Sequence, residues 1–93
     1  MKEKSIMPPS HLYETERREG LERHEPWGAS NRQKSIEMGL YVFLTPQMHR
    51  GKNGAHGNAK FNNELKRIAQ QTAMEHYGLT KKQWIAMFGR NLL

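Results

Sequence analysis

Three histidines and one carboxylate of this chain are spaced so that they could bind a metal ion and carry out hydrolysis. His24 is followed directly by Glu25, and His49 and His56 come later in the chain. The chain contains no cysteine, so a metal would be held by imidazole, carboxylate, amide or carbonyl groups. This donor set suits a divalent cation with open coordination positions.

Two short strands are expected to bring these side chains together. Residues 39–44 form an apolar run bounded by Gly39 and Pro46, and residues 21–27 are its expected antiparallel partner, with 29–38 as a polar connection. His24 and Glu25 lie at the end of the first strand, and His49 follows the second strand in a helical turn with Pro46 at its first position.

A glycine-rich stretch follows His49. Residues 51–57 contain three glycines, which disfavour a stable helix and allow the backbone to approach a ligand closely. Asn53 and His56 lie in this stretch, and either side chain could complete a site that needs only two or three protein ligands.

Phosphodiester hydrolysis is the reaction that best suits such a site. A neutral imidazole accepts a proton from water near pH 7, and a metal ion stabilises charge on the phosphate and the leaving oxygen. Four cations flank the centre and are candidates for gripping a phosphate backbone: Arg32, Lys34, Arg50 and Lys52.

Each of these features also has a purely structural interpretation. His24 and Glu25 are compatible with a solvated pair at a strand end, His49 with a helix cap, and the four cations with an ordinary solvated surface. The residues by themselves indicate a small basic α+β domain that could have a histidine metal site and bind nucleic acid.

Two helices are expected in the C-terminal third. Apolar residues recur at helical spacing from Phe61 to Thr72, and Asn58 and Gly78 are suitable cap residues, which predicts a helix at about 59–77. Residues 80–83 (TKKQ) match a capping box that starts a shorter helix ending near Phe88. The second helix carries a stripe that is expected to pack on the first, made of Trp84, Ile85 and Phe88.

Composition limits the class of protein. The 93 residues are enough for one domain, and the net charge of +6 resides entirely in residues 24–93, because residues 1–23 contain equal numbers of acidic and basic side chains. A basic chain attracts polyanions such as nucleic acid. No apolar segment is long enough for a bilayer span or a signal peptide, so we expect a soluble protein of the cytoplasm. Residues 1–12 are expected to be a flexible arm.

The order of these segments resembles a family of small phage and prophage proteins of HNH endonuclease type, which have the ββα-metal or His-Me finger fold. The resemblance rests on LERHEPWG at 21–28, NRQKS at 31–35, GLYVFL at 39–44, Pro46, His49, GAH at 54–56 and FGRN at 88–91. It implies an α+β fold in which a β-hairpin and a helical turn hold the metal and two helices follow, with residues 13–93 as a single HNH-like domain.

The resemblance also implies roles for individual residues. His24 corresponds to the general base and Glu25 to a metal ligand, although the single histidine in this pair leaves the reverse assignment open. His49 and His56 match metal-binding histidines. Mg²⁺ or Mn²⁺ is the expected working ion, and Zn²⁺ or Ni²⁺ also suits a site rich in histidine.

The function expected from the resemblance is a phage-encoded, metal-dependent DNA endonuclease or nickase acting in the bacterial cytoplasm. The alternative is a catalytically inactive relative that binds DNA or inhibits a host protein. DNA is the expected partner, and a homodimer would enlarge the small core.

Overall fold

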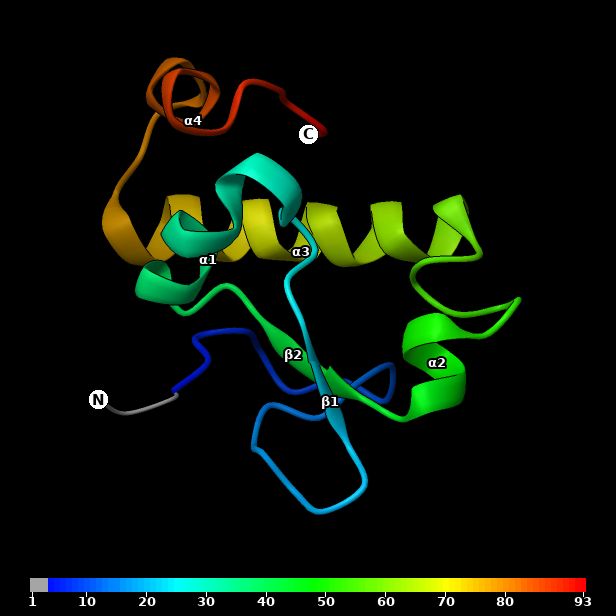
Figure 1. The fold of residues 1–93 in the computed structure, drawn as a ribbon. Coiled ribbons are helices and arrows are strands. Elements are labelled where there is room, and N and C mark those ends of the chain that lie inside the picture. The colour runs from blue at the N-terminus through cyan, green and yellow to red at the C-terminus, as the bar shows by residue number, and fades with distance from the viewer. Residues whose placement is uncertain (1–3) are drawn as a thin grey trace.

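The structure is a computed structural model that describes residues 4–93. Its elements, in chain order, are β1 (Glu22–His24), the 3-10 helix η1 (Ala29–Asn31), α1 (Arg32–Met38), β2 (Val42–Leu44), α2 (Pro46–Arg50), α3 (Ala59–Tyr77) and α4 (Lys81–Phe88). In Figure 1, α3 crosses the molecule, with the two strands and α2 on one side and α4 on the other. The fold is of the mixed α+β class, as the sequence predicts.

The sheet consists of two short antiparallel strands. Its register pairs Glu22 with Leu44, Arg23 with Phe43 and His24 with Val42. Both strands are shorter than the predicted segments 21–27 and 39–44. All of β2 is buried, which agrees with its continuous apolar sequence.

The segment between the strands differs from the sequence prediction. Residues 29–38 were expected to be a polar connection, but they contain η1 and α1. The buried Ser35 hydroxyl donates to the Trp27 carbonyl at 3.1 Å, and Gly39 ends α1 with a φ of +78°. Because this helix depends on a polar anchor to the preceding chain, apolar periodicity did not reveal it.

The two C-terminal helices have the expected ends. The Asn58 side chain caps α3 and Gly78 ends it in the left-handed conformation. Thr80 and Gln83 form both hydrogen bonds of the capping box at the start of α4. In α4, Trp84 and Phe88 are buried, whereas Ile85 is 43% exposed and does not belong to the packed stripe.

The N-terminal segment is packed more closely than the expected flexible arm at 1–12. The Ile6 amide donates to the Gly39 carbonyl at 2.9 Å, and the Ser5 hydroxyl donates to the Tyr41 carbonyl at 2.6 Å. Met7 is only 4% exposed and joins the hydrophobic core. Residues 1–3 of the predicted arm lie outside the described residues.

None of the helices in residues 4–93 combines the length and the apolar character that a transmembrane span requires.

Candidate metal centre

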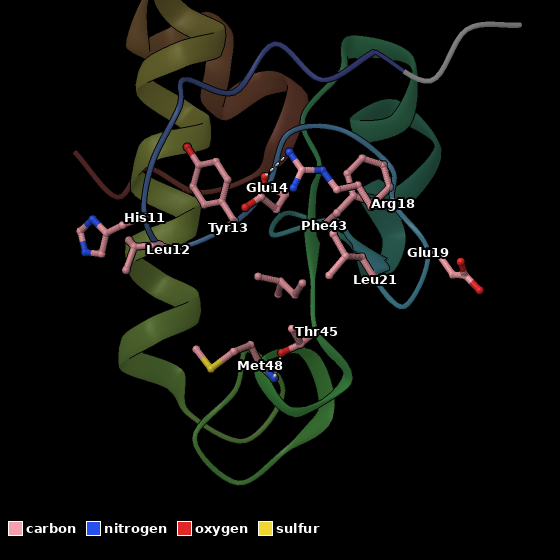
Figure 2. A pocket seen from close by; sticks show the side chains of 11 residues that line it. His11, Leu12, Tyr13, Glu14, Arg18, Glu19, Leu21, Phe43, Thr45 and Met48 are labelled. Atoms are coloured by element: carbon pink, nitrogen blue, oxygen red, sulfur yellow. Dashed lines mark hydrogen bonds and ion pairs between the residues drawn. The ribbon is translucent and has the colours of Figure 1, made fainter.

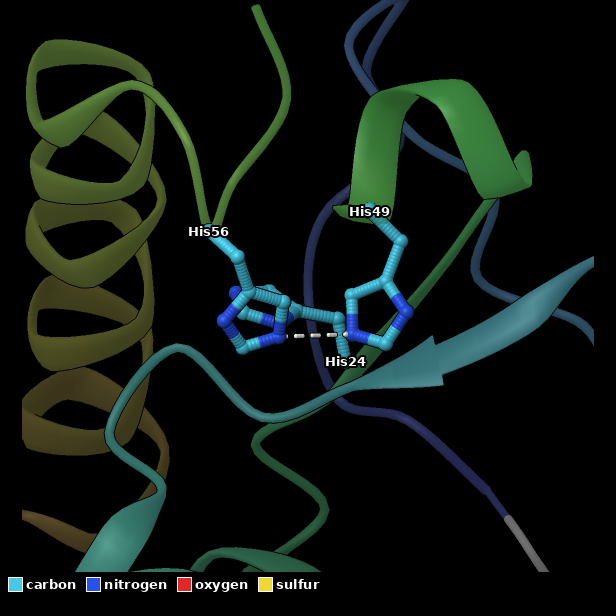
Figure 3. A group of neighbouring side chains, drawn as sticks. All are labelled: His24, His49 and His56. Carbon is cyan, nitrogen blue, oxygen red and sulfur yellow. Dashed lines mark hydrogen bonds between the residues drawn. The ribbon is translucent and has the colours of Figure 1, made fainter. Parts of the chain in front are cut away.

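Three histidine side chains meet at one point, although they come from three different elements. His24 is the last residue of β1, His49 lies in the last turn of α2, and His56 lies in the turns that follow α2. Each offers a ring nitrogen, and these atoms all lie within 4.8 Å of one another. Figure 3 shows the three rings converging from the strand, the short helix and the connecting segment. The group is close enough to hold a metal ion.

Backbone hydrogen bonds attach the glycine-rich turns to α2. The amide of Ala55 donates to the Met48 carbonyl at 2.7 Å, and the amide of His56 donates to the His49 carbonyl at 3.1 Å. A Cβ atom at Gly54 would lie only 2.5 Å from the Met48 carbonyl oxygen. The close approach that brings His56 beside His49 therefore requires glycine at position 54.

A carboxylate determines which nitrogen of His49 can bind a metal. The Nδ1 atom of His49 lies 2.8 Å from Glu22 Oε1. An ionised carboxylate only accepts hydrogen bonds, so Nδ1 carries the proton and Nε2 presents a lone pair. This carboxylate and histidine arrangement is typical of metal sites in proteins. Hydrogen bonds from His49 and then Arg50 hold the pKa of Glu22 below its usual value, which favours its ionised form.

The spacing of two imidazole nitrogens fits a shared ion. Nε2 of His49 and Nε2 of His56 are 3.1 Å apart and share a hydrogen bond, in which His56 donates because Nε2 of His49 carries the lone pair. Two nitrogens bound at about 2.0–2.1 Å to one ion would be roughly 2.9–3.4 Å apart for bond angles between octahedral and tetrahedral values. These two residues therefore need little rearrangement to become ligands.

His24 is held by a residue of α3. Its Nε2 atom lies 2.8 Å from Asn62 Oδ1, an acceptor, so Nε2 donates and Nδ1 keeps its lone pair. The side chain is 4% exposed, and this burial lowers the pKa of His24 to about 4. The imidazole is neutral at physiological pH, which is the form that either binds a metal or accepts a proton.

Glu25, predicted as a metal ligand, is not part of the histidine group. Its carboxylate accepts from Arg23 Nε at 2.9 Å and from Arg32 Nε at 3.3 Å. Glu25 lines the cleft beside His24, but these two arginines engage its carboxylate, and it does not join the three ring nitrogens.

The four predicted phosphate-binding cations have different environments. Arg50 pairs with Glu22 through bonds of 2.6 and 3.0 Å, while Lys52 is exposed in the turns after α2. Arg32 pairs with Glu25 and its side chain is 63% exposed. Lys34 donates to the Met87 carbonyl and its ammonium lies 5.2 Å from the centre of the Phe88 ring. Lys34 therefore joins α1 to α4 and is the least available of the four.

Glu22 and Asn62 contact the histidine group but were not predicted from the sequence as site residues. Glu22 precedes His24 by two positions in a strand, which places both side chains on the same face and was a usable signal. Asn62 lies near the start of α3, and no sequence pattern connects it with His24. Only the packing of α3 against the end of β1 brings the two side chains together.

Two hollows lie at the surface around these elements. A cleft of about 410 Å³ adjoins the histidines, and its lining comprises His24, Glu25, Trp27, Gly28, Ala29, Ser30, Asn31, His56, Asn62, Lys66, Phe88 and Arg90. Figure 2 shows the other, of about 350 Å³, between residues 11–21, β2 and α2. It includes His11, which is not a member of the histidine group, and its lining contains none of the three clustered histidines.

Comparisons with protein-family models, with curated proteins and with solved structures find no match to this chain.

Proposed function

We propose that the protein is a metal-dependent DNA endonuclease or nickase of HNH type. The observation that carries this proposal is the convergence of His24, His49 and His56 from a strand, the following short helix and an adjoining turn. This order matches the hairpin and helical turn that the sequence resemblance implies. The net charge of +6 favours a polyanionic substrate.

In this proposal His49 and His56 are the metal ligands. The hydrogen bond to Glu22 orients the His49 ring and makes it a stronger donor, and an ion bound between the two Nε2 atoms would replace the proton that they share. Imidazole donors suit Zn²⁺ and Ni²⁺, and Mg²⁺ or Mn²⁺ would bind through fewer protein ligands and more water. When bound, the ion would stabilise negative charge on the phosphate and the leaving oxygen.

His24 is the general base in this proposal. Asn62 occupies its Nε2 atom, so Nδ1 is the nitrogen that can take a proton from the attacking water. The residue also lines the cleft beside His56, where a substrate strand could reach it. Glu25 has no direct role, because its carboxylate is engaged by Arg23 and Arg32.

Plasmid nicking tests the proposal. The purified protein is incubated with supercoiled DNA in EDTA, Mg²⁺, Mn²⁺, Ni²⁺ or Zn²⁺, together with His24→Ala and the control His76→Ala, which changes an exposed histidine of α3. We expect metal-dependent relaxation that falls by about 10²–10⁴ in rate for His24→Ala, the range expected for loss of a general base. The control should cut at the wild-type rate.

Measurements of metal affinity distinguish a general base from a metal ligand among the three histidines. By titration calorimetry with Ni²⁺ or Zn²⁺, His49→Ala and His56→Ala should lose affinity, while His24→Ala should stay within about twofold of wild type. Equal loss in all three variants would make His24 a third ligand. Absence of cleavage with every ion, with DNA binding retained, would reject the nuclease and favour the inactive DNA-binding relative.

A further inference from the structure

The cleft beside the histidines contains two cations that the site described above does not use. Lys66 projects from α3, and Arg90 follows the end of α4. Both line the cleft together with His24 and His56, and the charge of Arg90 acts on Lys66. The cleft therefore extends from the candidate metal centre to a pair of positive charges.

Lys66 is held in place by an aromatic ring. Its ammonium lies 5.2 Å from the centre of the Trp27 ring, and its carbonyl accepts from Trp27 Nε1 at 2.9 Å. The residue is partly buried, and this burial together with the neighbouring charge of Arg90 holds the pKa of Lys66 below its usual value. A fixed cation loses little conformational freedom when it binds an anion.

The backbone before Arg90 is also held by several contacts. Gly89 ends α4 with a φ of +87°, which turns the chain at this point. The Phe88 carbonyl accepts from Asn31 Nδ2 at 3.2 Å, and the Met87 carbonyl accepts from Lys34. Arg90 therefore leaves an anchored turn and is exposed at the cleft.

In the part of the chain that the structure describes, Lys66 and Arg90 have no carboxylate partner. Within residues 4–93, neither Lys66 nor Arg90 forms an ion pair, and the one acidic residue in the cleft lining, Glu25, is engaged by Arg23 and Arg32. Two like charges at one cleft repel each other, so a bound anion would relieve an unfavourable interaction. A phosphodiester suits the site because it has a single negative charge and two unesterified oxygens, and guanidinium pairs with such oxygens through two hydrogen bonds.

We propose that Lys66 and Arg90 bind a backbone phosphodiester of the nucleic-acid strand that passes the histidine group. This inference rests on the proposed function for its substrate class, and it extends the substrate site from the strands and α2 to α3 and the end of α4. The phosphate bound here is a neighbour of the scissile phosphate, because His24 and His56 line the other part of the same cleft.

The salt dependence of DNA binding tests the inference without cleavage. Affinity for a short duplex is measured by fluorescence anisotropy in EDTA between 50 and 300 mM salt, for wild type, Lys66→Met, Arg90→Gln and the double variant. Methionine keeps the apolar stem over Trp27. Lys82→Met is the matched control, because Lys82 is exposed on α4 and is absent from the cleft lining.

The expected change follows from counterion release. Each lost phosphate contact should reduce the slope of log K against log salt by about 0.9, which corresponds to roughly eightfold weaker binding at 0.1 M salt. The double variant should lose about this whole amount, because both side chains bind the same phosphate, each single variant should lose a part of it, and Lys82→Met should keep the wild-type slope.

The outcomes distinguish this inference from the proposed function. Wild-type slopes in Lys66→Met and Arg90→Gln, with melting temperatures near that of wild type, would overturn the phosphate site even if the protein cuts DNA. Reduced slopes in a protein that never cuts DNA would support the phosphate site and reject the nuclease. Equal losses in Lys82→Met would show that the effect is only general charge, which also overturns the inference.

Discussion

The aromatic cluster and the histidine group lie close to each other but are built on different physical principles. Trp27, Trp84 and Phe88 pack ring against ring, with Trp84 and Phe88 stacked at 4.0 Å between ring centres. The histidines are positioned by hydrogen bonds to Glu22 and Asn62 instead.

The aromatic cluster therefore contributes mainly to stability, and the histidine group mainly to the positions of its side chains. Apolar burial has no preferred direction and scales with area, so the aromatic cluster stabilises the fold and tolerates small shifts of its rings. Hydrogen bonds require a narrow range of distance and angle, so the histidine group sets positions and contributes less stability. Substitutions in the first region should therefore lower stability, and substitutions in the second should lower metal affinity.

The largest effect is expected for Trp84→Ala. Trp84 is fully buried in the centre of the aromatic cluster, and its removal should lower the free energy of unfolding by about 3–5 kcal/mol, in the range seen for large-to-small core changes. Denaturant unfolding measures the loss. For a small domain this is a large part of the total stability.

Trp84→Phe provides the matched comparison. The Nε1 atom of Trp84 is buried and, in the described part of the chain, has no hydrogen-bond partner. Phenylalanine removes this unsatisfied donor and keeps an aromatic ring, so it should cost clearly less than alanine. Equal losses for both variants would show that the cluster does not act through apolar packing.

An intermediate effect on stability and a strong effect on metal binding are expected for Gly54→Ala. The added Cβ would meet the carbonyl oxygens of Met48 at 2.5 Å and of Gln47 at 2.6 Å, so the turn must shift and carry His56 away from His49. We expect a loss of about 1–3 kcal/mol in stability, as for other crowding substitutions, and a loss of metal affinity by calorimetry.

Gly78→Ala is the control for this prediction. Gly78 has a φ of +66° and no atom within 4 Å of an added Cβ, so alanine should cost about 1 kcal/mol of stability through backbone strain alone. Metal affinity should stay at the wild-type value. A drop in metal affinity similar to that of Gly54→Ala would mean that global destabilisation, and not the turn, controls the site.

The smallest effect on stability is expected for Glu22→Gln. The change removes the negative charge that holds Nδ1–H of His49 but keeps the shape of the side chain. Metal affinity should fall by about tenfold or more, the lower end of the range for such supporting carboxylates, and stability should change by less than about 0.5 kcal/mol. Calorimetry and denaturant unfolding measure the two quantities.

Glu64→Gln serves as the reference for Glu22→Gln. Glu64 pairs with Arg67 on the surface of α3 in an exposed salt bridge, so this substitution changes the net charge equally without contacting a histidine. Identical metal affinities for both variants would contradict a role of Glu22 in orienting His49.

The elements that sequence reasoning found correctly are those whose signals are local. The cap at Asn58, the stop at Gly78 and the capping box at Thr80 each depend on residues within one or two helical turns. The α+β class also follows from local patterns, because the apolar run before Pro46 is too short for a buried helix.

The errors occur where distant contacts decide the structure. Residues 29–38 form η1 and α1 because Ser35 is anchored to the Trp27 carbonyl and Asn31 to the end of α4. Ile85 follows the helical apolar pattern but is 43% exposed. Met7 is buried in the hydrophobic core, although residues 1–12 were predicted to form a flexible arm.

Residue type and short spacing were enough to predict the helix caps, the presence of two strands and the candidate histidines. Which polar side chains meet depends on the packing of the folded chain. It turned Glu25 toward Arg23 and Arg32, placed Glu22 against His49, and brought Asn62 to His24. The physical reason is that the face on which a strand residue lies, and the helix that packs against it, depend on contacts between residues far apart in the chain.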